Sequence, residues 1–185
     1  MSDRARRPVR ALLGLAALLA TTLTGPAAFA GPYAAGSVGY RHSLGLDAGG
    51  LSLGAHLGVT FGRFGLEYGS IWSNDHTFKP VEERRVARNT NFFDLMVAPV
   101  SGEHVQLWIG VGPGLGWVRP PGKPVGPSRV MSAGLHEYLR LDLLLGDDVQ
   151  LRYGLRVGAW HLWQGELVDG PEHALDVGLM VGFGF

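Results

Sequence analysis

The chain has 185 residues with 16 basic and 16 acidic side chains, so its formal net charge is zero, and it contains no cysteine. Without cysteine the protein has neither a disulfide framework nor thiolate chemistry. The balanced charge also argues against the strongly basic surface that nucleic-acid binding requires. We therefore expect no nucleic-acid partner.

The first thirty residues have the three parts of a secretory signal peptide. Four arginines lie within residues 4–10, an apolar run covers residues 11–23, and Ala-Phe-Ala stands at 28–30. The apolar run is shorter than the roughly 20 residues of a membrane-spanning helix, so a cleaved signal is favoured over an anchor. We expect residues 1–30 to be removed and residues 31–185 to form one domain, which holds 12 basic and 15 acidic residues.

After the signal segment, apolar residues recur at every second position in eight stretches, which is the pattern of β-strands. The pattern is cleanest from Leu51 to Phe61 and in the last thirteen residues, where it continues to Phe185. Most stretches reach the roughly 9 to 11 residues that a strand needs to cross a bilayer. The predicted strands cover residues 33–43, 51–61, 64–72, 91–100, 104–118, 129–145, 149–163 and 173–185.

The links between these strands alternate in length. Those after the second, fourth and sixth strands are tight turns, whereas residues 73–90, 119–127 and 164–172 form longer polar or Pro/Gly-rich links. Short turns at one end and longer loops at the other are typical of outer-membrane barrels. The sequence therefore predicts an all-β protein, a single eight-stranded antiparallel up-and-down transmembrane β-barrel.

Two residues disturb the alternation. Pro113 lies inside the fifth strand, where it indicates a bulge or a locally open ladder. Strict alternation would place Glu137 among the leucines of the sixth strand. Because a charge in mid-bilayer costs a few kcal/mol, we expect a bulge near Glu137 and Tyr138 that shifts the register.

Periodicity alone does not decide which face points outward, and a soluble barrel with an apolar interior is the alternative. Aromatic residues at both ends of the apolar faces favour the membrane barrel, because such residues form girdles at the two membrane interfaces. The glycine row at residues 110–116 suits an inner wall that leaves room for neighbouring side chains. The girdle residues are Tyr40, Trp72, Phe93, Trp117 and Trp163 at the outer rim, and Phe61, Phe64, Tyr153 and Phe185 at the inner rim.

The inward faces carry four basic and four acidic residues: Arg41, Glu67, Asp94, Arg140, Asp142, Arg152, Arg156 and Asp176. Unpaired charges in a narrow barrel would be costly, so we expect a paired, hydrogen-bonded network. Asp176 should pair with an arginine of the first or seventh strand. Because eight strands enclose just enough room for side chains, a filled polar core is favoured over a conducting pore. The alternative is a small gated pathway in which Arg152 and Arg156 switch partners.

Residues 31–185 resemble the small eight-stranded outer-membrane proteins of the OmpA and OmpX type. The resemblance rests on the signal peptide, the rhythm of strands and loops, and the terminal Phe185. It implies a monomer in the outer membrane of a Gram-negative bacterium, in contact with membrane lipid and lipopolysaccharide. It also implies that the barrel-assembly machinery recognises Val181, Phe183 and Phe185.

No catalytic, cofactor-binding or metal-ligating set stands out. A nucleophile and its base must lie within hydrogen-bonding distance, but His42 and Ser43 are strand neighbours that point to opposite faces. His161 and His173 have no serine beside them. An enzyme that modifies lipid A is therefore a less favoured alternative, and we expect no catalytic residues, cofactor or metal.

The external loops are the remaining place for a function. The loop after the third strand holds Lys79, Arg84, Arg85 and Arg88, which are suited to lipopolysaccharide phosphates or a surface partner; a solvated loop of mixed charge is the plain alternative. We expect a barrel that is structural or engages ligands and surfaces through its loops. A narrow channel or a carrier of small hydrophobic ligands is the alternative.

Overall fold

The computed structural model describes residues 31–44, 47–77, 85–119, 130–146, 149–163 and 172–185. The predicted signal peptide lies outside these residues. Within them, no helix is long and apolar enough to span a membrane. Eight strands close into a barrel: β1 (Gly31–Ser43), β2 (Ala48–Phe61), β3 (Phe64–Thr77), β4 (Arg85–Ser101), β5 (Val105–Arg119), β6 (Val130–Leu145), β7 (Gln150–Leu162) and β8 (Glu172–Gly184).

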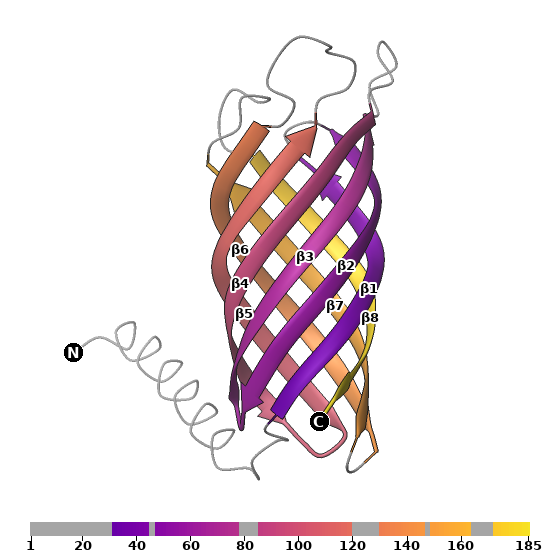
Figure 1. Cartoon of the computed structure of the whole chain (residues 1–185), viewed down its shortest axis with the longest axis vertical. Helices are drawn as coiled ribbons and strands as arrows, with labels where there is room; N and C mark the ends of the chain where they lie inside the picture. The colour runs from indigo at the N-terminus through magenta and orange to yellow at the C-terminus, as the bar shows by residue number, and fades with distance from the viewer. Residues whose placement is uncertain (1–30, 45–46, 78–84, 120–129, 147–148, 164–171) are drawn as a thin grey trace, which may run out of the picture.

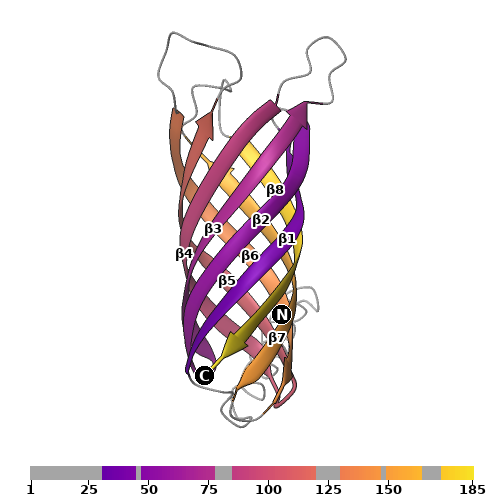
Figure 2. The same ribbon diagram turned by 45° about the vertical axis from the view of Figure 1, so that its right-hand side comes forward.

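Every strand pairs antiparallel with its neighbours in the chain, and β1 closes the barrel by pairing with β8 (Figures 1 and 2). The predicted all-β, eight-stranded, up-and-down fold is thus confirmed. Tight turns at Gly62, Gly102 and Gly146 lie at the same end as Gly31 and Phe185; we call it the turn end. The opposite end, where β3 meets β4 and β7 meets β8, is the loop end. At the turn end, Gly62 and Gly146 have positive φ angles of 64° and 100°, which suit glycine.

The predicted loop over residues 73–90 is largely wrong. Strand β3 continues to Thr77 and β4 already begins at Arg85, and the two pair as far as His76 and Arg85. The polar residues misled the prediction because polar side chains on both faces look like a loop. In a barrel the inward ones can pair with charges from other strands, and the outward ones can lie beyond the apolar part of the wall.

The predicted bulge in the sixth strand is also wrong. Between residues 130 and 145 the register of β6 runs without a shift against both β5 and β7. Glu137 therefore does lie on the outward face, with its side chain 53% exposed and its carboxylate paired with His161. The bulge is in β4, between Val97 and Val100. Near Pro113 the register is kept, but the Cα pairing of β4 with β5 skips from Phe92 to Leu95.

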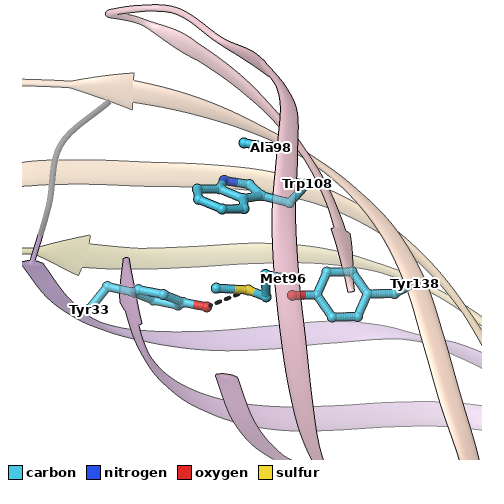
Figure 3. Packing of buried hydrophobic residues seen from close by; sticks show 5 residues of the cluster. All are labelled: Tyr33, Met96, Ala98, Trp108 and Tyr138. Carbon is cyan, nitrogen blue, oxygen red and sulfur yellow. Dashed lines mark hydrogen bonds between the residues drawn. The ribbon is translucent and has the colours of Figure 1, made fainter. Parts of the chain in front are cut away.

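The two faces of the wall differ sharply. Large apolar side chains of every strand are exposed on the outside; Leu51, for example, is 75% exposed. The core lies inside the barrel and includes two apolar clusters. One comprises Tyr33, Met96, Ala98, Trp108 and Tyr138, whose side chains gather in Figure 3. The other comprises Ile71, Phe92, Trp160, Leu162 and Ala174.

Inward glycines make room for the rings that fill the barrel. A Cβ atom added at Gly114 would lie 2.8 Å from the Trp160 ring, and one at Gly69 or Gly110 would overlap the ring of Phe92 or Tyr138. These glycines leave room for large side chains of other strands that lie across them. This explains how a narrow barrel accommodates several aromatic rings.

Candidate functional site

All eight charged residues predicted for the interior are buried inside the barrel. They come from β1, β3, β4, β6, β7 and β8, so only closure of the barrel brings them together. Their hydrogen bonds and ion pairs form two groups in the middle of the barrel, which both contact the Tyr138 ring, and a third set toward the loop end. Burial without compensation would be costly for each of them, so their partners decide what the interior can do.

Glu67 of β3 is the centre of the first group. Its Oε2 atom accepts hydrogen bonds from the Tyr33 hydroxyl and from Nη1 of Arg140. Its Oε1 atom lies 3.2 Å from Nδ1 of His56, whose ring Nε2 is 2.9 Å from the Ser37 hydroxyl. Because the carboxylate accepts from Nδ1, Nε2 of His56 accepts the proton of Ser37.

The group continues from Arg140 toward the turn end. Nε of Arg140 lies 3.1 Å from the Asp142 carboxylate, and Nη1 of Arg152 lies 3.6 Å from the same oxygen. The Arg152 guanidinium also stacks 4.5 Å from the centre of the Tyr33 ring. Charges of opposite sign therefore alternate from Glu67 through Arg140 and Asp142 to Arg152, as expected of a core that compensates its own charges.

The second group has His136 at its centre. Its Nδ1 lies 2.6 Å from the Asp94 carboxylate and its Nε2 lies 2.7 Å from Nη2 of Arg156. A guanidinium has only donors, so Nε2 accepts and Nδ1 carries the proton. The Arg156 guanidinium lies over the rings of Phe92 and Tyr138 at 4.7 and 4.6 Å. The His136 ring thus lies between the Asp94 carboxylate and the Arg156 guanidinium and contacts both.

Toward the loop end, Asp176 accepts a hydrogen bond of 2.8 Å from the Trp160 indole, and Arg41 is its register partner across β1 and β8. Nη1 of Arg41 donates to the Thr90 hydroxyl at 3.0 Å. Asp75 and Arg88 form a buried ion pair of 2.9 Å. Arg88, predicted to lie in an external loop, is therefore an interior residue of β4.

The uncharged members of these groups, His56, His136, Tyr33 and Trp160, were not predicted. Strict alternation places all four on inward faces, although the expected bulge near Glu137 would have turned His136 outward. Their polar atoms on the inward face are the signal that identifies them. Their particular partners depend on the stagger between strands, which alternation does not report.

Ser37, His56 and Glu67 have the spacing of a nucleophile, a base and an acid. The two distances, 2.9 and 3.2 Å, fall within the range that such a triad requires. However, the second oxygen of Glu67 is already held by Tyr33 and Arg140, and His56 is 1% exposed.

Among the described residues, no group of three or more His, Cys, Asp or Glu side chains is placed to hold a metal ion.

The outer wall holds the other predicted residues. The aromatic girdle side chains Tyr40, Phe61, Phe64, Trp72, Phe93, Tyr153 and Trp163 are exposed on it, and Trp117 is half-buried. Val181, Phe183 and Phe185 are also exposed, and the rings of Phe183 and Phe185 lie 5.9 Å apart. Arg85 is the first residue of β4, whereas Lys79 and Arg84 lie outside the described residues.

No protein-family model and no curated protein matches this sequence. Several solved structures are similar in fold, three crystal structures among them. Neisserial surface protein A has a TM-score of 0.67 at 13% identity, covering 83% of this chain and 97% of its own. The N-terminal β-barrel domain of Pseudomonas aeruginosa OprF has a TM-score of 0.56 at 11% identity, covering 85% and 100%.

The third is Ail, the attachment invasion locus protein of Yersinia pestis, in complex with the heparin analogue sucrose octasulfate. Its TM-score is 0.52 at 13% identity, and the match covers 84% of this chain and 99% of Ail. Identities this low show the fold alone. The chain has the fold of the small eight-stranded outer-membrane β-barrels.

Proposed function

We propose that residues 31–185 form a monomeric barrel in the outer membrane of a Gram-negative bacterium, exported by a signal peptide of residues 1–30. In this proposal the barrel is a filled anchor, and its function lies at the loop end. The observation that carries the proposal is the inversion of the wall, which has apolar side chains outside and charged side chains buried inside.

The outward side chains support a lipid environment. Along β8, every second residue from Leu175 to Phe185 is apolar and exposed. Soluble monomers rarely expose continuous apolar patches larger than a few hundred Å², and here such side chains surround the barrel. Lipid tails around the wall would remove that apolar surface from water.

The filling of the barrel supports a closed lumen. Near the turn end the Tyr33, Met96 and Trp108 side chains lie across the interior, as Figure 3 shows. In the middle the two charged groups are held together by the hydrogen bonds of Glu67 and His136. Nearer the loop end the Asp75–Arg88 pair is buried as well. This packing speaks against a conducting channel and against a carrier that holds a hydrophobic ligand inside the barrel.

We further propose that the protein has no enzymatic activity and meets lipopolysaccharide or another anionic surface partner through its loop between β3 and β4. The sequence supports the partner, since Lys79 and Arg84 lie between the two strands and Arg85 follows as the first residue of β4. Ail, which has the same fold, was crystallised with a sulfated ligand. The barrel-assembly machinery would act on the chain's last strand.

Three measurements test the proposal. After cell fractionation the protein should be recovered in the outer membrane and require detergent for extraction; recovery in a detergent-free periplasmic fraction would contradict it. In planar bilayers it should show no stable single-channel steps. Replacing Lys79, Arg84 and Arg85 together by serine should weaken binding to lipopolysaccharide vesicles without changing thermal stability, whereas unchanged binding would remove the proposed role of these residues.

A further inference from the structure

Near the loop end, the outward wall carries a pair of histidines that neither the barrel network nor contact with lipid explains. His161 of β7 and His173 of β8 are direct register partners, close to the loop end of both strands. The outward positions of β7 from Leu151 to Ala159 and of β8 from Leu175 to Phe185 are all apolar or tyrosine. The two histidines therefore interrupt an otherwise apolar surface.

The two imidazoles face each other through the same ring atom. Their Nδ1 atoms are 2.8 Å apart, with the rings inclined at 69°. On the far side of the first ring, Nε2 of His161 lies 3.1 Å from the Glu137 carboxylate. Because a carboxylate only accepts, Nε2 of His161 carries the ring proton. Nδ1 of His161 then has a free lone pair and accepts a hydrogen bond from Nδ1 of His173.

We propose that His161 and His173 bind a divalent transition-metal ion, Cu(II) or Ni(II), through their Nδ1 atoms on the outside of the barrel. The ion replaces the hydrogen bond between the two nitrogens and lies beside the line that joins them. His173 then carries its proton on Nε2 instead of Nδ1, so both imidazoles stay neutral and no proton is released. Water completes the coordination, since the Glu137 carboxylate contacts the opposite nitrogen of His161 and the described residues hold no group of three or more His, Cys, Asp or Glu side chains that could bind a metal ion.

The spacing of the two nitrogens favours some metals over others. With metal–nitrogen bonds of about 2.0 to 2.1 Å, nitrogens 2.8 Å apart subtend an angle of about 85° at the metal. That angle suits neighbouring positions in square-planar or octahedral coordination, which Cu(II) and Ni(II) adopt, better than tetrahedral Zn(II). Copper also stands highest among the divalent ions in affinity for such ligands.

Glu137 has the place of an orienting carboxylate. Metal-binding histidines usually donate their second ring N–H to a carboxylate or carbonyl, which fixes the tautomer and raises the basicity of the ligating nitrogen. Glu137 provides that contact to His161 and is a positioning residue in this site. The pairing also gives a reason for a carboxylate on a wall otherwise suited to lipid.

The site is accessible. The His161 side chain is 33% exposed and His173 is exposed, and both lie on rigid, paired strands. Binding requires each imidazole to turn by about 45°, so that its Nδ1 lone pair points at an ion beside the line that joins the two nitrogens.

The test uses the full chain, purified in detergent micelles without a polyhistidine tag. Titration with CuCl₂ is followed by calorimetry, and the copper signal by electron paramagnetic resonance. The wild type should bind one ion per chain with hyperfine structure from two imidazole nitrogens. His161→Asn and His173→Asn should each weaken binding at least tenfold, and Glu137→Gln should weaken it less.

His104→Asn is the matched control, because His104 is an exposed histidine at the opposite end of the barrel; its affinity should equal that of the wild type. Far-ultraviolet circular dichroism checks that every variant keeps its strands. Equal affinity of the wild type and the His161→Asn/His173→Asn double variant, or a spectrum from a single imidazole, would overturn the proposal.

Discussion

Glu67 and Arg140 form an ion pair inside the barrel although 73 residues separate them in the chain. Tyr33 and His56 share the same carboxylate, so four strands meet at one side chain. Removing one member of a buried pair leaves an uncompensated charge, which is the costly event. Removing one of the two charges therefore tests whether this pair stabilises the fold.

Glu67→Gln keeps the shape of the side chain but leaves the Arg140 guanidinium facing a neutral amide. We expect the free energy of unfolding to fall by about 3 kcal/mol, measured by urea unfolding in detergent micelles. The matched control is Glu103→Gln in the exposed turn before β5, which should change stability by less than about 0.5 kcal/mol. A loss of similar size in both variants would mean that the pair does not stabilise the barrel.

Replacing both partners tests the coupling directly. Glu67→Gln combined with Arg140→Met removes both charges, so the double variant should lose less than the two single losses added together, by at least about 1 kcal/mol. Additive losses would show that Glu67 acts through Tyr33 and His56 rather than through Arg140.

Arg156→Ala tests whether the interior is a filled core. The variant removes the donor to His136 and the guanidinium that lies over Phe92 and Tyr138. We expect lower stability in urea and no single-channel conductance in planar bilayers. Unchanged stability together with new conductance would instead indicate a gated pathway.

The glycines of the wall are predicted to be tolerant or intolerant according to what lies across them. Gly114→Val would push side-chain atoms into the Trp160 ring and should destabilise the barrel by about 1–3 kcal/mol. At Gly36 the nearest heavy atom to an added Cβ would be 3.9 Å away. Gly36→Val is therefore the control and should leave the urea midpoint unchanged or raise it.

Deleting Phe185 separates assembly from stability. In the folded barrel its backbone N–H donates to Pro32 at 3.0 Å and its ring lies on the outside. We expect the deletion to reduce the amount of protein in the outer membrane severalfold, while chain refolded in detergent unfolds close to the wild-type urea midpoint. If the amount of protein in the outer membrane and the urea midpoint fall together, Phe185 acts through stability alone.

The strands were predictable because alternation is a local property. From Leu51 to Phe61 each side chain points to the opposite face from the one before it. The order of neighbouring residues therefore predicts an apolar outer face and a more polar inner face. The prediction of a loop failed at Asp75 and Arg88. Their charges are typical of a loop, but in the structure they form a buried ion pair between β3 and β4. It also failed at Glu137, whose cost is relieved by His161 on another strand.

The sequence by itself determined the number of strands, their order and the inward side of all eight predicted charges. Only the tertiary structure decided which of these side chains contact each other. Pairing depends on how far each strand is displaced along its neighbour when the barrel closes, and that displacement brings Glu67 to Arg140 and Asp94 to His136. Alternation repeats every two residues and contains no such offset, so contacts across the barrel appear only once it is closed.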